Sequence, residues 1–284
     1  MGADALARAN RVRSMLFVPG TRSDRFEAAA SSGADMATVD LEDAVAPPLK
    51  AEARADAIAF LSGETPNALR AVRINPLSTT YGLADMLALI EARPTGGHLF
   101  LPKVAGPEEI RLADALLTNA GLNLPMIVLI ETADALSHAD AVAAATPRLV
   151  MVVFGAVDLS AELCAENARE PLLYARSKVV HAARRAGIAA LDVPSLNFRD
   201  LDEVRSDAAY ARSLGFSGKA CIHPSNLAPI HDVFTPSEEE VAHAKRVMEA
   251  YENSSTGLAV LDGKLIELPV VRAAERVLAL ADRG

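Results

Sequence analysis

The feature that most constrains the fold of this chain is a series of eight short, apolar, β-rich runs spread along its 284 residues. Their starts lie about 20 to 40 residues apart, and most are followed by an Ala-, Leu- and Arg-rich segment with helical spacing. Continuous apolar character is typical of parallel strands buried on both faces. The runs begin at Met15, Met36, Leu69, His98, Met126, Leu149, Ala189 and Lys219. The chain has neither a GxGxxG turn nor a P-loop lysine, so the pattern favours an α/β fold of the closed (β/α)8 TIM-barrel type over a doubly wound sheet.

A further segment follows the eighth run. The sequence TPSE at 235–238 predicts a capping box with Pro236 at the first helical position. The sequence LAVLDGKLIEL predicts a hairpin that turns at Asp262-Gly263, and Pro269 opens a final amphipathic helix. We therefore expect a barrel catalytic domain at 13–253 and a C-terminal extension or lid at 254–284.

Composition excludes several classes of protein. The 28 Lys and Arg against 37 Asp and Glu give a net charge of −9, which argues against nucleic-acid binding because that needs a basic face. The longest purely apolar stretch, at 149–157, is far shorter than a bilayer span, and the start resembles no signal peptide, so we expect no membrane segment and a cytoplasmic location. Two cysteines, Cys164 and Cys221, exclude a disulfide framework, and both are predicted to fill the core.

Polar residues at the carboxyl ends of the strands are the candidates for chemistry, because barrel active sites lie there. They are Asp40, Glu42, Asp43, Arg73, Asn75, Lys103, Glu131, Asp158, Asp192 and His223. Acids outnumber cations in this set, and crowded carboxylates need a positive charge nearby. Oxygen ligands without clustered Cys or His favour Mg²⁺ over Zn²⁺.

Glu131 and Asp158 are the best pair of metal ligands, because adjacent strands deliver them side by side. Alone, Asp158 could equally be a helix cap or a partner in a loop salt bridge. Arg73 is costly to bury unpaired, so it should face a carboxylate or an anionic substrate. The alternative for Arg73 is a purely structural pairing with Asp40 or Glu42.

Two other strand-end residues have structural interpretations that we favour. Lys103 could form a Schiff base, but no partner that would lower its pKa is evident, so we expect a salt bridge to the acidic mouth. His223 precedes a proline and stands alone, so a structural histidine is favoured over a catalytic base.

Eight segments in a fixed order carry a family resemblance. They are RSMLFVPGTR, DLEDAV, VRIN, LPK, LIET, GAVDLS, SGKACIHP and DGKLIELP, between Arg13 and Ala281. Together they resemble the citrate lyase β-subunit-like family, the branch of the HpcH/HpaI aldolase superfamily that includes malyl-CoA and citramalyl-CoA lyases. The resemblance implies a Mg²⁺-dependent (β/α)8 barrel, commonly a homotrimer or hexamer, that makes or breaks a carbon–carbon bond beside a thioester.

The resemblance also implies roles for individual residues. Glu131 of LIET and Asp158 of GAVDLS correspond to metal ligands, and Arg73 of VRIN corresponds to the residue that meets the thioester oxygen. Glu42 and Asp43 of DLEDAV correspond to acids that hold metal-bound water and Arg73, as carboxylates around a metal site commonly do.

Three further positions concern the cofactor and the acid/base. Arg22 of PGTR resembles a CoA-contacting arginine. Glu267 stands where related lyases commonly carry an acid/base aspartate that reaches in from a neighbouring subunit, and Ala28 stands where some carry a CoA-contacting lysine. These two departures concern reactivity and CoA affinity more than metal binding.

The expected activity is cleavage of a 3-hydroxyacyl-CoA thioester of the malyl-CoA or citramalyl-CoA type to acetyl-CoA and a small 2-oxo acid. Three alternatives use the same residues. They are a malyl-CoA thioesterase, a citrate lyase β subunit that acts on an acyl-carrier-protein thioester, and a binder of CoA esters without turnover.

Overall fold

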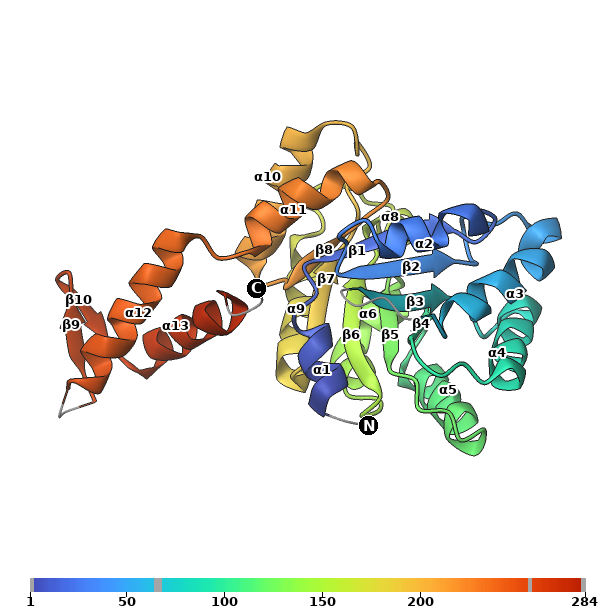
Figure 1. Ribbon diagram of the computed structural model, residues 1–284, viewed down its shortest axis with the longest axis horizontal. Coiled ribbons are helices and arrows are strands. Elements are labelled where there is room, and N and C mark those ends of the chain that lie inside the picture. Colours follow the sequence, from blue (N-terminus) through green and yellow to red (C-terminus); the bar gives the residue numbers. More distant parts are fainter. Residues whose placement is uncertain (1–2, 64–67, 255–256, 282–284) are drawn as a thin grey trace. The chain divides into compact units, whose positions relative to one another are not determined.

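Eight parallel strands close into a barrel in the order β1 to β8, as the apolar runs predict (Figure 1). The computed structural model describes residues 3–63, 68–254 and 257–281. The strands are β1 (Ser14–Pro19), β2 (Met36–Asp40), β3 (Leu69–Arg73), β4 (His98–Leu101), β5 (Met126–Ile130), β6 (Leu149–Phe154), β7 (Ala189–Asp192) and β8 (Gly218–Cys221). Strand β1 pairs with both β2 and β8, so the sheet has no free edge. The prediction of a (β/α)8 barrel is confirmed.

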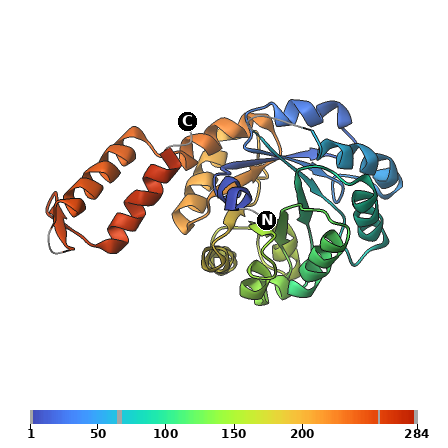
Figure 2. The ribbon, with the colours of Figure 1, turned by 60° about the horizontal axis from the view of Figure 1, so that its bottom comes forward.

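Helices lie on the outside of this barrel, with those that follow β2 to β4 running along one side (Figure 2). Short 3₁₀ helices open three of the connections: η1 (Ser23–Arg25), η2 (Pro47–Leu49) and η3 (Pro224–Asn226). The α-helices of this part are α1 (Ala3–Ala9), α2 (Phe26–Ala30), α3 (Lys50–Phe60), α4 (Thr80–Ala92), α5 (Pro107–Asn119), α6 (Ala133–Ser137), α7 (Ala139–Ala143), α8 (Ala156–Glu162), α9 (Leu173–Ala186), α10 (Leu201–Leu214) and α11 (Leu227–Phe234).

The barrel interior is filled by a buried apolar cluster that includes Met15, Met36, Phe100, Ile127 and Met151. Ala9 and Val12 belong to the same cluster. Because the first residues of several strands are also members, α1 and the turn after it cover the amino end of the barrel. The carboxyl end is therefore the end at which an active site can open, as it does in barrel enzymes generally.

The chain divides into two compact units, one up to His231 and one from Asp232 on. The second unit holds α12 (Glu238–Glu252), the hairpin strands β9 (Ala259–Leu261) and β10 (Lys264–Ile266), and α13 (Leu268–Ala281). Its small core joins Val247 of α12 to Ile266 and Val271. This boundary differs from the one expected from the sequence after residue 253, because α12 packs with the hairpin and α13.

Local details of the second unit follow the sequence in part. The hairpin turns at Asp262-Gly263, and both residues have a positive φ, as a two-residue type I′ turn requires. The predicted capping box is displaced. The N-cap of α12 is Ser237, whose side chain accepts a hydrogen bond from the amide of Glu240, while the Glu240 side chain accepts one from the Ser237 amide. Pro236 therefore precedes the N-cap, and the assignment of Pro236 to the first helical position is wrong.

The two cysteines differ in their surroundings. Cys221 is buried at the end of β8, as expected, but Cys164 is exposed in the turn after α8 with a φ of 53°. The prediction that Cys164 fills the core is therefore wrong, because the helix ends before its side chain can turn inward. In the part of the chain that the structure covers, none of the helices is both long and apolar enough to cross a membrane.

Candidate active site at the carboxyl end of the barrel

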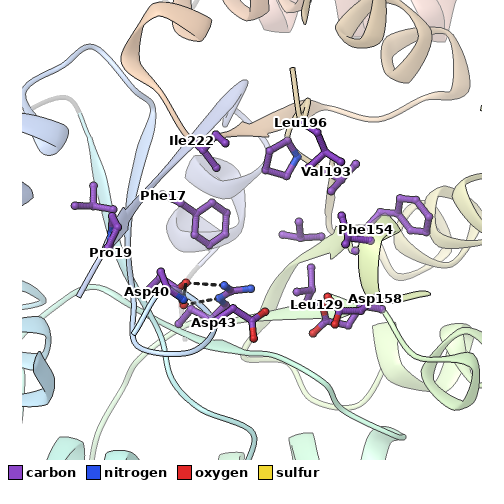
Figure 3. A pocket seen from close by; sticks show the side chains of 18 residues that line it. Phe17, Pro19, Asp40, Asp43, Leu129, Phe154, Asp158, Val193, Leu196 and Ile222 are labelled. Carbon is purple, nitrogen blue, oxygen red and sulfur yellow. Dashed lines mark hydrogen bonds and ion pairs between the residues drawn. The ribbon is translucent and has the colours of Figure 1, made fainter. Parts of the chain in front are cut away.

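A cavity of about 360 Å³ opens at the carboxyl ends of the strands and receives several of the polar side chains expected there. Arg73, Glu131, Asp158, Asp40 and Asp43 all line it. Figure 3 shows the labelled acids on one side of this cavity and apolar side chains on the other. The apolar wall comes from Phe17, Leu129, Val153, Phe154, Val157, Val193, Leu196 and Ile222.

Arg73 is the cation at the base of the site. It is the last residue of β3 and lies in register beside Asp40, the last residue of β2. Its Nε and Nη2 each donate to one oxygen of the Asp40 carboxylate at 2.7 Å, and its Nη1 lies 3.1 Å from Oε2 of Glu42. The guanidinium also lies 5.1 Å from the centre of the Phe17 ring.

These contacts show whether Arg73 has a structural pairing, a position that faces a ligand, or both. Although burial lowers the pKa of Arg73, the carboxylates of Asp40 and Glu42 raise it above its ordinary value. Arg73 therefore does pair with Asp40 and Glu42, and it also lines the cavity. The structural and functional interpretations of Arg73 are thus compatible, since the acids fix a guanidinium that a ligand can still reach.

Glu42 is a buried carboxylate with unused bonding capacity. Its side chain is only 4% exposed. Lys103 Nζ lies 2.9 Å from Oε1 and Arg73 Nη1 lies 3.1 Å from Oε2, but neither contact is a well-directed hydrogen bond, and both oxygens are buried without a hydrogen-bond partner among the described residues. Burial raises the pKa of Glu42. Both oxygens remain available to accept hydrogen bonds from water or a ligand.

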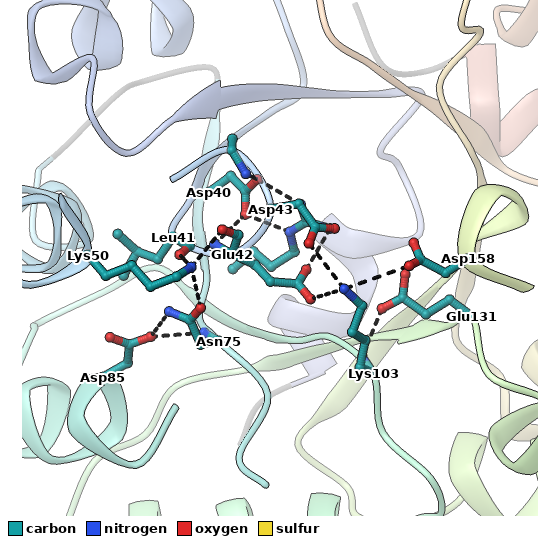
Figure 4. A network of polar contacts seen from close by, with 12 residues as sticks. Asp40, Leu41, Glu42, Asp43, Lys50, Asn75, Asp85, Lys103, Glu131 and Asp158 are labelled. Atoms are coloured by element: carbon teal, nitrogen blue, oxygen red, sulfur yellow. Dashed lines mark hydrogen bonds and ion pairs between the residues drawn. The ribbon is translucent and has the colours of Figure 1, made fainter. Parts of the chain in front are cut away.

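Lys103 links the acids of the mouth, as Figure 4 shows. Its ammonium lies 2.9 Å from Glu42, 3.1 Å from Asp43 and 3.7 Å from Asp158. The expected salt bridge is therefore confirmed. Burial lowers the pKa of Lys103, but the nearby carboxylates of Glu42 and Asp43 raise it above its ordinary value. A Schiff base would need a neutral amine, so this environment does not favour one.

The backbone of Lys103 adds a second constraint. Its φ of 46° is unusual for a residue with a side chain, and its amide donates to Oε1 of Glu131 at 2.8 Å. Strained backbone of this kind persists where the surroundings enforce it and is common at functional sites. The strained peptide holds the carboxylate of Glu131 in place.

Glu131 and Asp158 lie together at the mouth. Glu131 directly follows β5 and is buried, whereas Asp158 lies in the first turn of α8 and its side chain is 42% exposed. Their carboxyl groups lie beside each other, facing Lys103 (Figure 4). Burial first, and then the charges of Glu42 and Asp158, raise the pKa of Glu131 to about 8. The structure therefore brings the two predicted ligands together in a field that attracts a cation.

Gly155 is a site residue that the sequence analysis did not identify. A methyl group at this position would lie 2.4 Å from Cβ and 3.0 Å from Oε2 of Glu131, so only glycine leaves room for that side chain. The contact is made by Gly155, at the end of β6, against a residue of the neighbouring strand. The glycine of GAVDLS was visible in the sequence, but its contact across strands was not.

The donor set fits a hard divalent cation. Two adjacent carboxylates, one of them buried, supply oxygen ligands, and a buried Glu42 with unsatisfied oxygens stands ready to hold metal-bound water. Mg²⁺ is usually bound by one or two carboxylates, with water and substrate completing its shell. Residues 3–63, 68–254 and 257–281 contain no group of three or more His, Cys, Asp or Glu side chains placed to hold a metal. The two-carboxylate arrangement is therefore what this chain itself can offer.

Other predicted site residues lie away from the cavity or in the second unit. Arg22, in the turn after β1, pairs with Asp24 through two hydrogen bonds of 2.9 and 2.8 Å and does not line the cavity. Glu267 belongs to the second unit. The roles assigned to Arg22 and Glu267 therefore stay predictions.

Two strand-end residues make structural contacts outside the cavity. His223 is exposed, accepts a hydrogen bond from the Ser225 amide and so caps η3, as a structural histidine would. Asp192 accepts from Arg176 Nε at 3.0 Å and from Lys219 Nζ at 3.3 Å in a separate buried cluster. Neither residue lines the cavity that holds Glu131 and Asp158.

Known proteins resemble this chain in sequence and in fold. The sequence model of the HpcH/HpaI aldolase/citrate lyase family matches residues 13–224. L-malyl-CoA/beta-methylmalyl-CoA lyase of Cereibacter sphaeroides is 33% identical over 97% of this chain and 96% of that protein. The mitochondrial citramalyl-CoA lyase of Rattus norvegicus is 32% identical over 95% of this chain and 86% of that protein.

A solved structure agrees with these relatives. The protein CitE of Mycobacterium tuberculosis, in complex with magnesium, acetoacetate and coenzyme A, has a TM-score of 0.83 and 30% identity, covering 96% of this chain and 100% of that one. The family match covers most of the chain, and the barrel and the site lie within it. The chain therefore belongs to the HpcH/HpaI aldolase/citrate lyase family, and it is an enzyme of the lyase class.

Proposed function

We propose that this protein is a Mg²⁺-dependent lyase that cleaves a 3-hydroxyacyl-CoA thioester of the malyl-CoA or citramalyl-CoA type into acetyl-CoA and a 2-oxo acid. One observation carries the proposal. Arg73, held by Asp40 and Glu42, lines the same cavity as the adjacent carboxylates Glu131 and Asp158. The named lyases among its relatives and the magnesium and coenzyme A in the CitE complex support it.

The reaction requires charge stabilisation at two places. The hydroxyl of the substrate loses its proton, the bond between the carbinol carbon and the next carbon breaks, and its electron pair moves onto the thioester as an enolate. A Mg²⁺ ion held by Glu131 and Asp158 would supply Lewis acidity at the hydroxyl and carboxylate oxygens of the substrate. Arg73 would stabilise the enolate oxygen, since a fixed guanidinium acts where that charge develops.

Other residues of the chain complete the reaction in this proposal. The free oxygens of Glu42 would accept hydrogen bonds from metal-bound water and so orient it. Glu267 would deliver a proton to the enolate carbon, which yields acetyl-CoA. Arg22 would contact the CoA moiety outside the cavity. The homotrimer or hexamer that the family resemblance implies and the cytoplasmic location expected from the sequence belong to the same proposal, and light scattering tests the first.

The test is product analysis with malyl-CoA and citramalyl-CoA, each incubated with and without Mg²⁺. We expect glyoxylate or pyruvate together with acetyl-CoA, released only when Mg²⁺ is present. The variant Glu131→Gln should lose this activity. The variant Glu162→Gln is the matched control, because Glu162 lies nearby at the end of α8, where it accepts a hydrogen bond from the amide of Ala133, outside the cavity lining.

The alternative activities give different results when the assay also includes the corresponding acyl-carrier-protein thioester. Free CoA thiol with malate and no 2-oxo acid would identify a thioesterase. Turnover of the acyl-carrier-protein thioester alone would identify a citrate lyase β subunit. Binding of the CoA esters without any turnover would identify a binder, and that result contradicts the proposal.

A further inference from the structure

Behind the acidic mouth, on the outer side of the strands, lies a chain of buried polar residues that the proposed mechanism does not use. It runs from Lys50 at the start of α3 through Asn75 to Asp85 of α4 (Figure 4). Arg54 pairs with Asp85 at the end of this chain. Lys50 is 7% exposed, and Asp85 is fully buried. Burying an ammonium and a carboxylate away from the cavity is costly, so their contacts must serve the fold or the site.

Lys50 binds the backbone that carries the site acids. Its ammonium donates to the carbonyl oxygens of Leu41 at 2.8 Å and Glu42 at 2.7 Å, and to Oδ1 of Asn75 at 2.6 Å. All three hydrogens of the ammonium are therefore used. From the cavity side, the Asp40 carboxylate accepts hydrogen bonds from the amides of Glu42 and Ala44 at 2.9 and 3.1 Å. The turn at 41–44 is thus held from both sides, by an ammonium on its carbonyls and by a carboxylate on its amides.

Asn75 joins this turn to the next strand end. It lies two residues after Arg73, and its backbone amide and Nδ2 donate to Oδ2 of Asp85 at 2.9 and 2.7 Å. Arg54 Nε donates to the other oxygen of Asp85 at 2.7 Å. The loops that follow β2 and β3 are therefore tied together by one hydrogen-bonded chain.

Gly82 allows α4 to come close enough to complete this chain. A methyl group at this position would lie 2.1 Å from the carbonyl oxygen of Pro76 and 2.6 Å from that of Asn75. Asp85 lies three residues later on the same face of the helix, above Asn75. A glycine is thus required for the close packing that delivers the Asp85 carboxylate to Asn75.

From this geometry we propose that Lys50 is a positioning residue of the active site, which acts by fixing the 41–44 turn so that the Glu42 carboxylate faces Arg73 and Lys103. The carboxylate of Glu42 has no hydrogen-bond partner among the described residues, so its position depends on the backbone that carries it and on these two ion pairs. The inference rests on the proposed function, because it assigns Lys50 to the metal-binding side of that site. Asn75 and Asp85 support Lys50 from behind.

The test compares Lys50→Met with Lys178→Met. Methionine keeps the length of the side chain but donates no hydrogen bonds. Lys178 is a matched control, because its Nζ also donates to a backbone carbonyl, of Ser137 at 3.2 Å, and lies 5.9 Å from a tyrosine ring, as Lys50 lies 5.7 Å from Tyr81. The probe is Mn²⁺, which prefers the same oxygen ligands as Mg²⁺, and its free concentration is followed by electron paramagnetic resonance in the absence of substrate.

We expect K50M to weaken Mn²⁺ binding and to lower kcat by about 10- to 100-fold each, the range found when supporting residues of a metal site are replaced, with a smaller change in KM. K178M should match the wild type. K50R, which keeps the charge and several donors, should recover part of the loss. A purely structural role would lower only the melting temperature. Wild-type Mn²⁺ affinity and kcat in folded K50M, measured well below its melting temperature, would therefore overturn the proposal.

A second variant covers the case in which K50M does not fold. Asp85→Asn keeps the shape of the side chain and weakens the support of Asn75, so we expect a decrease of a few fold in Mn²⁺ affinity and kcat. Unchanged values in D85N would overturn the proposal in that case. Because Mn²⁺ binding is measured without substrate, the result stands apart from the thioester cleavage assay, and failure of one proposal is distinguishable from failure of the other.

Discussion

Buried polar groups are paired more completely at the amino end of the barrel than at its carboxyl end. At the amino end, Arg13 donates from its amide, Nε and Nη2 to the carboxylate of Asp35, at 2.7 to 2.9 Å. Near it, the buried Arg70 pairs with Glu27 at 2.7 Å, and Nδ1 of His98 lies 3.0 Å from the carbonyl oxygen of Arg70. These groups form close contacts with one another, and they leave little for a ligand to satisfy.

At the carboxyl end, charged groups lack hydrogen bonds or lie in strained or crowded positions. The carboxylate of Glu42 is buried without a hydrogen-bond partner among the described residues, Lys103 has a strained backbone, and Glu131 is buried beside other acids. Each of these features costs stability in the absence of a ligand. The amino end therefore contributes to the stability of the fold, whereas the carboxyl end retains the bonding capacity that a metal and a substrate would use. Mutations at the two ends should therefore separate stability from activity.

The largest separation is expected for Glu131→Gln at the carboxyl end. Loss of a metal-binding carboxylate should lower kcat/KM by about 100- to 1,000-fold, more than the loss expected for a supporting residue. The stability of the metal-free protein should not fall. Because burial and neighbouring acids raise the pKa of Glu131 to about 8, the folded protein keeps a proton that the unfolded chain loses above about pH 4.5.

The sign of the pH effect follows from this difference in bound protons. The folded wild-type protein binds more protons than its unfolded chain between about pH 4.5 and 8, so its stability falls as the pH rises through this range. E131Q lacks this carboxyl group. Urea unfolding of both proteins in a chelator at pH 5, 7 and 8.5 should show that E131Q gains relative to the wild type as the pH rises. A constant difference would contradict the assignment of the raised pKa to Glu131.

At the amino end, His98 should give the opposite dependence on pH. Burial, and to a lesser extent the charge of Arg8, lowers the pKa of His98 to about 4. Between about pH 6.5 and 4 the unfolded chain takes up a proton that the folded protein does not, so stability falls as the pH falls. The loss is roughly 3 kcal/mol between pH 7.5 and 4. His98→Asn should lack this pH-dependent loss of stability, while its kcat at pH 7.5 stays unchanged. If the free energy of unfolding depended on pH in the same way in the variant and the wild type, the prediction would be contradicted.

Gly155→Ala tests the carboxyl end by adding one methyl group. The new Cβ would lie 2.4 Å from Cβ of Glu131, so Glu131 has to move. We expect kcat/KM and Mn²⁺ affinity to fall by about 10- to 100-fold and the free energy of unfolding to fall by about 1–3 kcal/mol. Gly96→Ala is the control at the amino end, because its Cβ would meet only the carbonyl oxygen of Leu61 at 3.6 Å. Equal activities of the two variants would disprove the role of Gly155.

The sequence was sufficient for the barrel and for the acids of its mouth for simple physical reasons. Most of the strands are predominantly apolar, and in a barrel the carboxyl ends of the strands must gather at one end, so Asp40, Arg73, Glu131 and Asp158 could be expected together. The pairing of Arg73 with Asp40 follows from the register of β2 and β3. Burial on both faces predicts parallel strands covered by helices, and the missing GxGxxG turn and P-loop lysine favour the closed barrel over a doubly wound sheet.

Residues whose role depends on a contact between distant segments were not found in this way. Gly155 matters because Glu131 crosses over it from the neighbouring strand, and Lys50 matters because α3 turns its first residue back toward the 41–44 turn. Neither contact produces a periodic pattern in the sequence. Cys164 was misassigned because a single cysteine in a helical segment does not reveal where that helix ends. The boundary at residue 231 likewise depends on which helix packs with α12.

The smallest expected effect is that of Asp35→Asn at the amino end, and it completes the comparison. Asparagine keeps one oxygen acceptor for Arg13 but loses the charge and the second acceptor. Hydrogen bonds to a charged group contribute about 1.5–3 kcal/mol, and part of that interaction survives, so the free energy of unfolding should fall by about 1–2 kcal/mol. Activity per folded molecule should match the wild type, because Asp35 lies before β2 whereas the site lies beyond its last residue. Urea unfolding and kcat/KM measured on the same preparation check both parts. A fall in kcat/KM without loss of stability would show that the two ends are coupled, and the division of labour inferred from their hydrogen bonding would then be incorrect.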